Sequence, residues 1–164
     1  MIDVRRSVGV LALLLTSAAP VAAAQGAAPA AVTGARAFAV EALGGTVGSA
    51  LGIAVGLAVA KPDECPSADD VVCTLRRLGI TGIIGVAGAT IGTAAAGRWA
   101  GTDPSLIGAF VGAAAGAAAG IGLEHLVTEE MGQSLGNAGT VVLFSVVQGM
   151  LAAAGSRLVA RVRR

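Results

Sequence analysis

The side chains that could do acid–base chemistry are few and stand apart in the sequence. The one histidine, His125, lies between Glu124 and Leu126, and we expect it to be a solvated loop residue. Glu129 and Glu130 are adjacent, and adjacent residues face different directions on a helix, so they make a poor acid–base pair. The motifs of a phosphate-binding loop, a serine hydrolase (G-x-S-x-G) and a zinc protease (H-E-x-x-H) do not occur. The sequence therefore predicts no catalytic, cofactor-binding or metal site, and no enzyme.

Cys65 and Cys73 are the two cysteines of the chain. An even number of cysteines in an exported protein favours a disulfide, and the C-x7-C spacing matches no common metal motif. We predict one disulfide that ties a proline-rich loop to the start of the next helix. Two free thiols or a metal site are the alternatives.

The composition indicates a membrane protein. Apolar residues make up 55% of the 164-residue chain and charged residues 13%, against about 25% charged in an average soluble domain. Three Phe and one Trp would fill a soluble core poorly. The net charge is +1 and no basic stretch contains aromatic residues, so nucleic-acid binding has almost no support. The expected partner is the lipid bilayer, with no small-molecule substrate evident.

The N-terminus has the three parts of a secretory signal. They are a positive start, a short apolar stretch and small residues before Gln25, namely Arg5 and Arg6, residues 8–16, and Ala22–Ala24. We predict a signal peptide over 1–24 and a flexible lead-in over 25–34. An uncleaved first transmembrane helix is the alternative. No Cys follows the cleavage point, so a lipoprotein signal is not indicated.

Four later stretches without charge have the length of a membrane span, namely 42–60, 78–97, 106–123 and 138–155. At about 1.5 Å per residue, each is close to the roughly 30 Å of a bilayer core. With flanking residues, the predicted helices are 35–60, 68–97, 104–123 and 138–160, and Asp103-Pro104 is expected to begin the third. Short connections make neighbouring helices antiparallel. The predicted fold is all-α, a four-helix transmembrane bundle of two hairpins within residues 35–164.

Glycines recur every four residues in two of these stretches, which we call glycine zippers. Residues four apart share one helix face, so a glycine row lets a second backbone approach closely. The first zipper is Gly44, Gly48, Gly52 and Gly56, and the other is Gly108, Gly112, Gly116 and Gly120. The second stretch is looser, with Gly85, Gly88, Gly92 and Gly97. We predict helix packing at all twelve, against this chain or another copy.

Sequence matches between the stretches indicate a duplicated hairpin. Low sequence complexity explains the same matches equally well. With Gly44 aligned on Gly108, seven small or branched residues match between the first and third stretches. The second and fourth share Ala-Ala-Ala-Gly at 94–97 and 152–155. In the membrane interior, Thr, Ser and Gln148 are expected to join helices by hydrogen bonds. Glu41, at the edge of the first stretch, is expected to reach the interface.

Charges divide between the two ends of such a bundle. The end with both termini carries six arginines against Glu41 and Asp103, a net +4, and the other end carries −4. This division is typical of a positive-inside topology. It conflicts with a cleaved signal at an inner membrane, which would leave the Arg-rich tail outside. Insertion into a second membrane from the periplasm resolves the conflict, so the outer membrane is slightly favoured over the inner.

The two zippers resemble those of the bacterial glycine-zipper membrane proteins of the cell envelope. Four glycine-patterned helices with cysteines between the first two also look like the mitochondrial inner-membrane translocase family, by architecture alone. Together with the absence of a catalytic motif, these features predict a non-enzymatic structural or assembly component of a bacterial envelope membrane, oligomeric through its glycine faces. The alternative is a pore- or channel-forming protein. A pore should show a long polar row on one helix face, and none is expected here.

Overall fold

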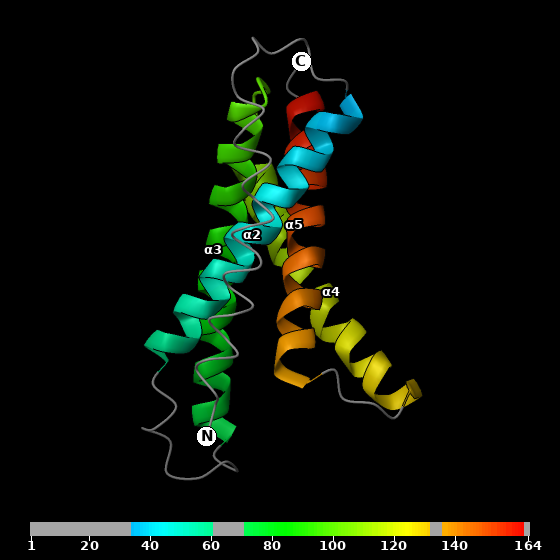
Figure 1. Ribbon diagram of the computed structural model, residues 1–164. Helices are drawn as coiled ribbons and strands as arrows, with labels where there is room; N and C mark the ends of the chain where they lie inside the picture. The colour runs from blue at the N-terminus through cyan, green and yellow to red at the C-terminus, as the bar shows by residue number, and fades with distance from the viewer. Residues whose placement is uncertain (1–33, 61–70, 132–135, 163–164) are drawn as a thin grey trace. The chain divides into compact units, whose positions relative to one another are not determined.

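The computed structural model describes residues 34–60, 71–131 and 136–162, with side chains described from 79 to 127 and from 138 to 162 in the later two ranges. The described residues form four helices (Figure 1), namely α2 (Gly34–Val59), α3 (Val71–Trp99), α4 (Leu106–Met131) and α5 (Gly136–Val162). Each is long and apolar enough to cross a membrane. The predicted all-α fold of four membrane-length helices is confirmed. The predicted signal peptide, the lead-in before Gly34, and Cys65 lie outside the described residues.

The third helix is longer than the sequence predicts. It continues to Met131, past Leu123, where the apolar stretch ends. Residues 124–131 include charged side chains, but Glu, Leu and Met among them favour helix. The helix therefore continues beyond the apolar stretch. His125 therefore lies exposed on α4 and not in a loop.

The four helices alternate in direction, as Figure 1 shows. The most extensive contacts are between α2 and α3 and between α4 and α5, and α2 also packs against α5. Helix α3 makes a smaller contact with α4. The chain therefore forms two antiparallel hairpins, α2/α3 and α4/α5, joined mainly through α2 and α5.

A tight turn joins the hairpins, and backbone geometry fixes its shape. Gly101 has a φ of 74°, a left-handed conformation that ends α3 without the steric cost of a Cβ. The amides of Gly101 and Thr102 donate to the carbonyls of Arg98 and Gly97 at 3.0 and 2.9 Å, which is the Schellman pattern of a helix C-terminus.

Ser105, and not Asp103, caps the start of α4. The hydroxyl of Ser105 accepts a hydrogen bond from the amide of Gly108 at 3.2 Å, and its carbonyl accepts the first helical bond, from Ala109, at 2.8 Å. This is the usual geometry of an N-cap residue. The prediction from Asp103-Pro104 is therefore wrong by two residues, because Ser105 is an equally good cap and lies closer to the apolar stretch.

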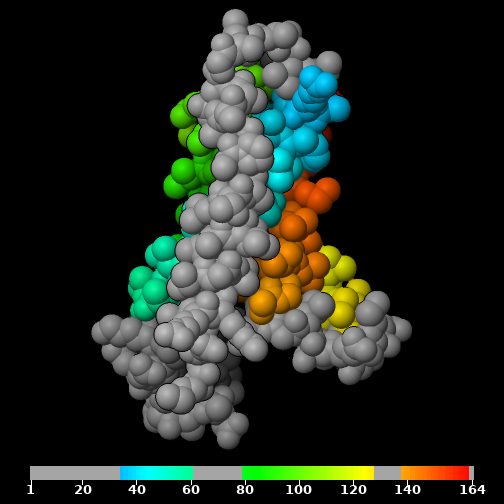
Figure 2. All heavy atoms as spheres, viewed as in Figure 1, coloured from blue at the N-terminus to red at the C-terminus, as the bar shows by residue number. Residues whose placement is uncertain are grey.

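Side chains are distributed in the opposite way to a soluble bundle. Most of the buried apolar side chains described are alanines, and buried polar residues include Ser49, Thr93 and Gln148. Large apolar side chains such as Ile83, Ile107 and Val111 are more than half exposed. Where α2 and α5 are both visible in Figure 2, their atoms meet directly. The described bundle thus has a small-residue interior and an apolar outer surface that suits contact with lipid.

Candidate functional site

Glycines of α2 and α3 interlock along the first hairpin. A Cβ atom added to Gly48 would overlap the carbonyl oxygen of Gly88, and one added to Gly88 would overlap that of Gly48. Gly44 and Gly92 have the same relation, with 2.5 Å from a Cβ on Gly44 to the Gly92 oxygen. Because the missing Cβ points at a carbonyl, a glycine Cα–H points there too, which is the geometry of a weak Cα–H···O contact.

The backbones of α2 and α3 are equally close toward the C-terminal end of α2. A Cβ on Gly52 would lie 3.0 Å from the Cα of Gly85, and one on Gly56 would lie 2.7 Å from the Cα of Thr81. All four glycines of the first zipper thus face the backbone of α3. The first zipper therefore packs against α3 of the same chain.

The second hairpin packs a glycine row against a helix that mostly carries side chains. Gly108 and Gly155 face each other's carbonyls, and a Cβ on Gly112 would overlap the carbonyl of Leu151. A Cβ on Gly116 would lie 2.6 Å from the Cα of Gln148. A Cβ on Gly120 would meet the ring of Phe144 at 2.9 Å. The row therefore lies on α5 throughout. Its first two glycines, Gly108 and Gly112, lie close to Gly155, and its last two face Gln148 and Phe144.

Two predicted packing glycines have other surroundings. A Cβ on Gly85 would meet the side chain of Ile53 at 3.0 Å, and one on Gly97 would meet Thr102 and Pro104 of the turn at 3.0–3.1 Å. Gly97 therefore packs against the α3–α4 turn, whereas Gly155 packs against α4. The shared Ala-Ala-Ala-Gly sequence does not occupy equivalent positions in the two hairpins.

Helix α2 carries a second row that the sequence did not predict, and its members Glu41, Gly45 and Ser49 face α5. Ala37, Glu41, Gly45, Ser49 and Ile53 recur every four residues and are all buried. A Cβ on Gly45 would lie 2.9 Å from the Cα of Gly149 on α5, and would overlap the hydroxyl of Thr93. The signal for this row was the doubled glycine at 44–45, since only one of two adjacent glycines can belong to each face.

Buried polar side chains of α2, α3 and α5 lie along this second row. The hydroxyl of Ser49 donates to the side-chain oxygen of Gln148, and both residues are at most 1% exposed. The buried hydroxyls of Thr93, Ser145 and Ser156 have no hydrogen-bond partner among the described residues. No single described helix carries a long polar row, but α2, α3 and α5 together place these polar side chains inside the bundle.

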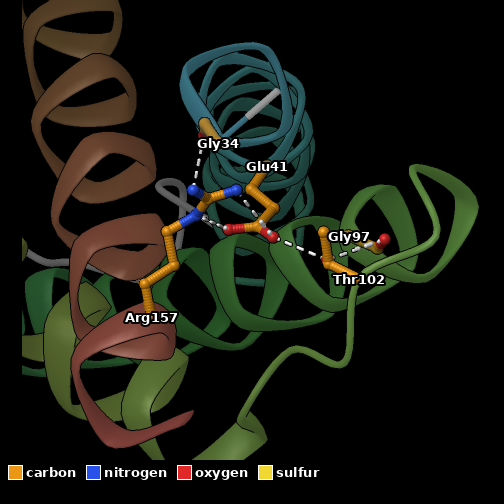
Figure 3. A network of polar contacts seen from close by, with 5 residues as sticks. All are labelled: Gly34, Glu41, Gly97, Thr102 and Arg157. Carbon is orange, nitrogen blue, oxygen red and sulfur yellow. Dashed lines mark hydrogen bonds and ion pairs between the residues drawn. The ribbon is translucent and has the colours of Figure 1, made fainter. Parts of the chain in front are cut away.

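The row begins at an ion pair between Glu41 of α2 and Arg157 of α5 (Figure 3). The Nε of Arg157 donates to Oε2 of Glu41 at 2.8 Å, and one of its terminal nitrogens lies 3.4 Å from Oε1. The other terminal nitrogen donates to the carbonyl of Gly34 at 2.6 Å. Glu41 is 1% exposed and the Arg157 side chain 24%. Glu41 is therefore buried and paired with a partly exposed arginine. That it lies at the level of a membrane interface stays a prediction.

The α3–α4 turn completes this cluster. The hydroxyl of Thr102 lies 2.7 Å from Oε1 of Glu41 and 2.9 Å from the carbonyl of Gly97. One hydroxyl has one proton, so it donates to one of these acceptors at a time. The guanidinium of Arg157 also lies over the ring of Phe38, 5.6 Å from its centre. Glu41, Arg157 and Thr102, which we call the clasp, thus join α2, α5 and the turn.

Nearer the other ends of α4 and α5, the hydroxyl of Thr140 donates to Oε1 of Glu124 at 3.0 Å. In the described part of the chain, no three His, Cys, Asp or Glu side chains gather where they could hold a metal ion. The side chain of Cys73 is outside the description, as is Cys65, so the predicted disulfide stays a prediction.

No protein-family model, no curated protein and no solved structure matches this chain.

Proposed function

We propose that this chain is an integral membrane protein, a non-enzymatic structural or assembly component of a bacterial envelope membrane. One observation carries the proposal, the distribution of side chains in the bundle. Glycine, alanine and hydroxyl side chains lie between the helices, and Leu, Ile, Val and Phe cover the outside. Such an outer surface is stable in lipid, whereas in water it would cause aggregation.

The arrangement also supports a scaffold that is held rigid. Backbone contacts run along each hairpin, and the clasp fixes one hairpin to the other. Both glycine zippers pack against helices of the same chain, the first against α3 and the second against α5. A homo-oligomer would therefore form through other faces. Side chains such as Phe110 and Val111 of α4, more than half exposed, are available for such contacts or for lipid.

Fractionation of native cells tests the proposal. We expect the protein in a membrane fraction, resistant to extraction at alkaline pH, and separation of inner from outer membrane identifies which one. The outer membrane is slightly favoured. Recovery in the soluble fraction would overturn the proposal.

Export is part of the proposal and rests on the sequence of residues 1–24. The mature protein should begin near Gln25. Intact mass measurement of the native protein checks this, and retention of the first 24 residues would favour an uncleaved helix instead.

The disulfide between Cys65 and Cys73 is also proposed from the sequence. Thiol labelling of the denatured protein should fail without reductant and succeed after reduction. Because the closed loop is short, its loss should cost only about 2–3 kcal/mol in the chain-entropy model. Complete labelling without reductant would show free thiols.

A pore or channel is the second candidate, and the buried polar row favours it. Ser49, Thr93 and Gln148 lie where three helices meet. The row begins at the ion pair of Glu41 and Arg157, and ionisable groups within membrane helices often mark a pathway. The row is closed in this conformation, since these side chains are at most 1% exposed. Ion flux through liposomes containing the purified protein, compared with a Gln148→Leu variant, separates the two functions. A pore should lose flux in the variant, and a scaffold should show none in either.

A further inference from the structure

Three arginines gather at the end of the bundle that carries the clasp. Arg36 lies in the first turn of α2, and Arg98 and Arg161 lie in the last turns of α3 and α5. The hydrogen bond from Arg157 to Gly34 and the contact of Thr102 with Glu41 bring these helix ends together, as Figure 1 also shows. All three arginines are exposed.

Among the described residues, the charge of these arginines is not cancelled by ion pairs. None of the three arginines forms an ion pair with another described residue. Glu41 is buried and paired with Arg157, which leaves Asp103 as the exposed acidic side chain described at this end. Helix dipoles explain cations at the C-terminal ends of α3 and α5, but a dipole repels a cation at an N-terminus. The dipole of α2 therefore does not account for Arg36.

Trp99 lies beside Arg98 at the same end and is 48% exposed. Tryptophan is enriched where the hydrocarbon of a membrane meets its headgroups. Exposed cations next to such an aromatic side chain attract the phosphates of anionic lipids. We propose that this end of the bundle binds anionic phospholipid headgroups through Arg36, Arg98 and Arg161, with Trp99 at the hydrocarbon boundary. The inference rests on the proposed membrane location.

Trp99 is the one tryptophan of the chain, so its fluorescence reports on this end alone. The full-length protein is reconstituted into phosphatidylcholine vesicles that contain a fixed minor fraction of brominated lipid, either phosphatidylglycerol or phosphatidylcholine. Bromine quenches tryptophan on contact. We expect brominated phosphatidylglycerol to quench Trp99 about two-fold more than brominated phosphatidylcholine, and high salt to reduce the difference.

Variants separate charge from fold. Arg36→Gln/Arg98→Gln/Arg161→Gln should abolish the preference, and the matching Arg→Lys triple variant should keep it. Arg76→Gln/Arg77→Gln, near the opposite end of α3, is the control and should leave the preference unchanged. Helical content by circular dichroism confirms that each variant is folded.

The remaining outcomes overturn one proposal or the other. Equal quenching by the two lipids in the native protein would overturn the anionic-lipid site while leaving the membrane location intact. An equal loss of preference in the control variant would also overturn it. Absence of quenching by either lipid would overturn the membrane location itself.

Discussion

The two hairpins use glycine in different ways. In α2/α3, glycines on both helices face each other's carbonyls, as Gly48 and Gly88 do. In α4/α5, one glycine row lies on a helix whose facing positions include Leu151 and Phe144. A four-residue glycine period therefore predicts that a helix will be approached closely, but it does not reveal what approaches it. The first hairpin depends on both helices, and the second depends mainly on α4.

The largest expected effect tests whether the hairpins are separate units joined by the clasp. Arg157→Met leaves the Glu41 carboxylate buried without its cation, and breaking a buried pair in this way costs about 3–5 kcal/mol. Glu41→Gln should cost less, because Arg157 is 24% exposed and can reach water. The measurement is the free energy of unfolding in detergent.

The double variant and proteolysis sharpen this test. Glu41→Gln/Arg157→Met should be more stable than Arg157→Met alone, because no unpaired charge remains. If each hairpin holds itself together, limited proteolysis of Arg157→Met should cut first in the turn over 100–105. Cleavage that begins inside either hairpin would show that the hairpins do not survive apart.

The next effect compares the middle of the two zippers. Leucine at Gly52 or Gly116 would collide with the facing backbone, and such overpacking costs about 1–3 kcal/mol. Ala54→Leu and Ala118→Leu are matched controls, because both alanines are exposed, and they should have little effect. Thermal stability in detergent measures all four variants. If all four tolerate leucine equally, the glycine rows have no special role in packing.

The sequence predicts those features of the fold and of the candidate site whose pattern lies within one helix. The four helices follow from apolar length, and the two zippers follow from a period within one helix. Glu41 and Arg157 are 116 residues apart, and each adjoins an apolar stretch, so nothing local indicates that they pair. Gly45 and Gly149 face each other across α2 and α5, and only the packed structure shows which of Gly44 and Gly45 faces which helix.

A smaller effect concerns the polar contact between the hairpins. Ser49→Ala removes the donor to Gln148, and hydrogen bonds between membrane helices contribute about 0.6 kcal/mol on average, up to about 1.7. A double-mutant cycle with Gln148→Leu should give a coupling in this range. Thr46→Ala is the control, because its hydroxyl donates to Ala42 of its own helix at 2.9 Å. A coupling of zero for Ser49 and Gln148 would mean that steric fit alone joins α2 to α5 here.

The final comparison is between the last glycines of the two zippers, Gly56 and Gly120. A Cβ on Gly56 would lie 2.7 Å from the Cα of Thr81, and backbone within a helix cannot move alone. A Cβ on Gly120 would meet only the ring of Phe144, a half-buried side chain that can turn aside. Gly56→Ala should therefore be less stable than Gly120→Ala by about 1 kcal/mol, at the low end of overpacking.

This last pair decides whether the difference between the hairpins is energetic or only geometric. Alanine is the smallest addition, and it also favours helix over glycine by about 1 kcal/mol, a gain common to both variants. The difference between them therefore isolates the contact itself, and denaturation in detergent under identical conditions measures it. Phe144→Ala combined with Gly120→Ala removes the ring as a check on its role. If Gly56→Ala proves as mild as Gly120→Ala, the facing backbone of α3 can yield as easily as a ring, and the contrast between the two hairpins loses its physical basis.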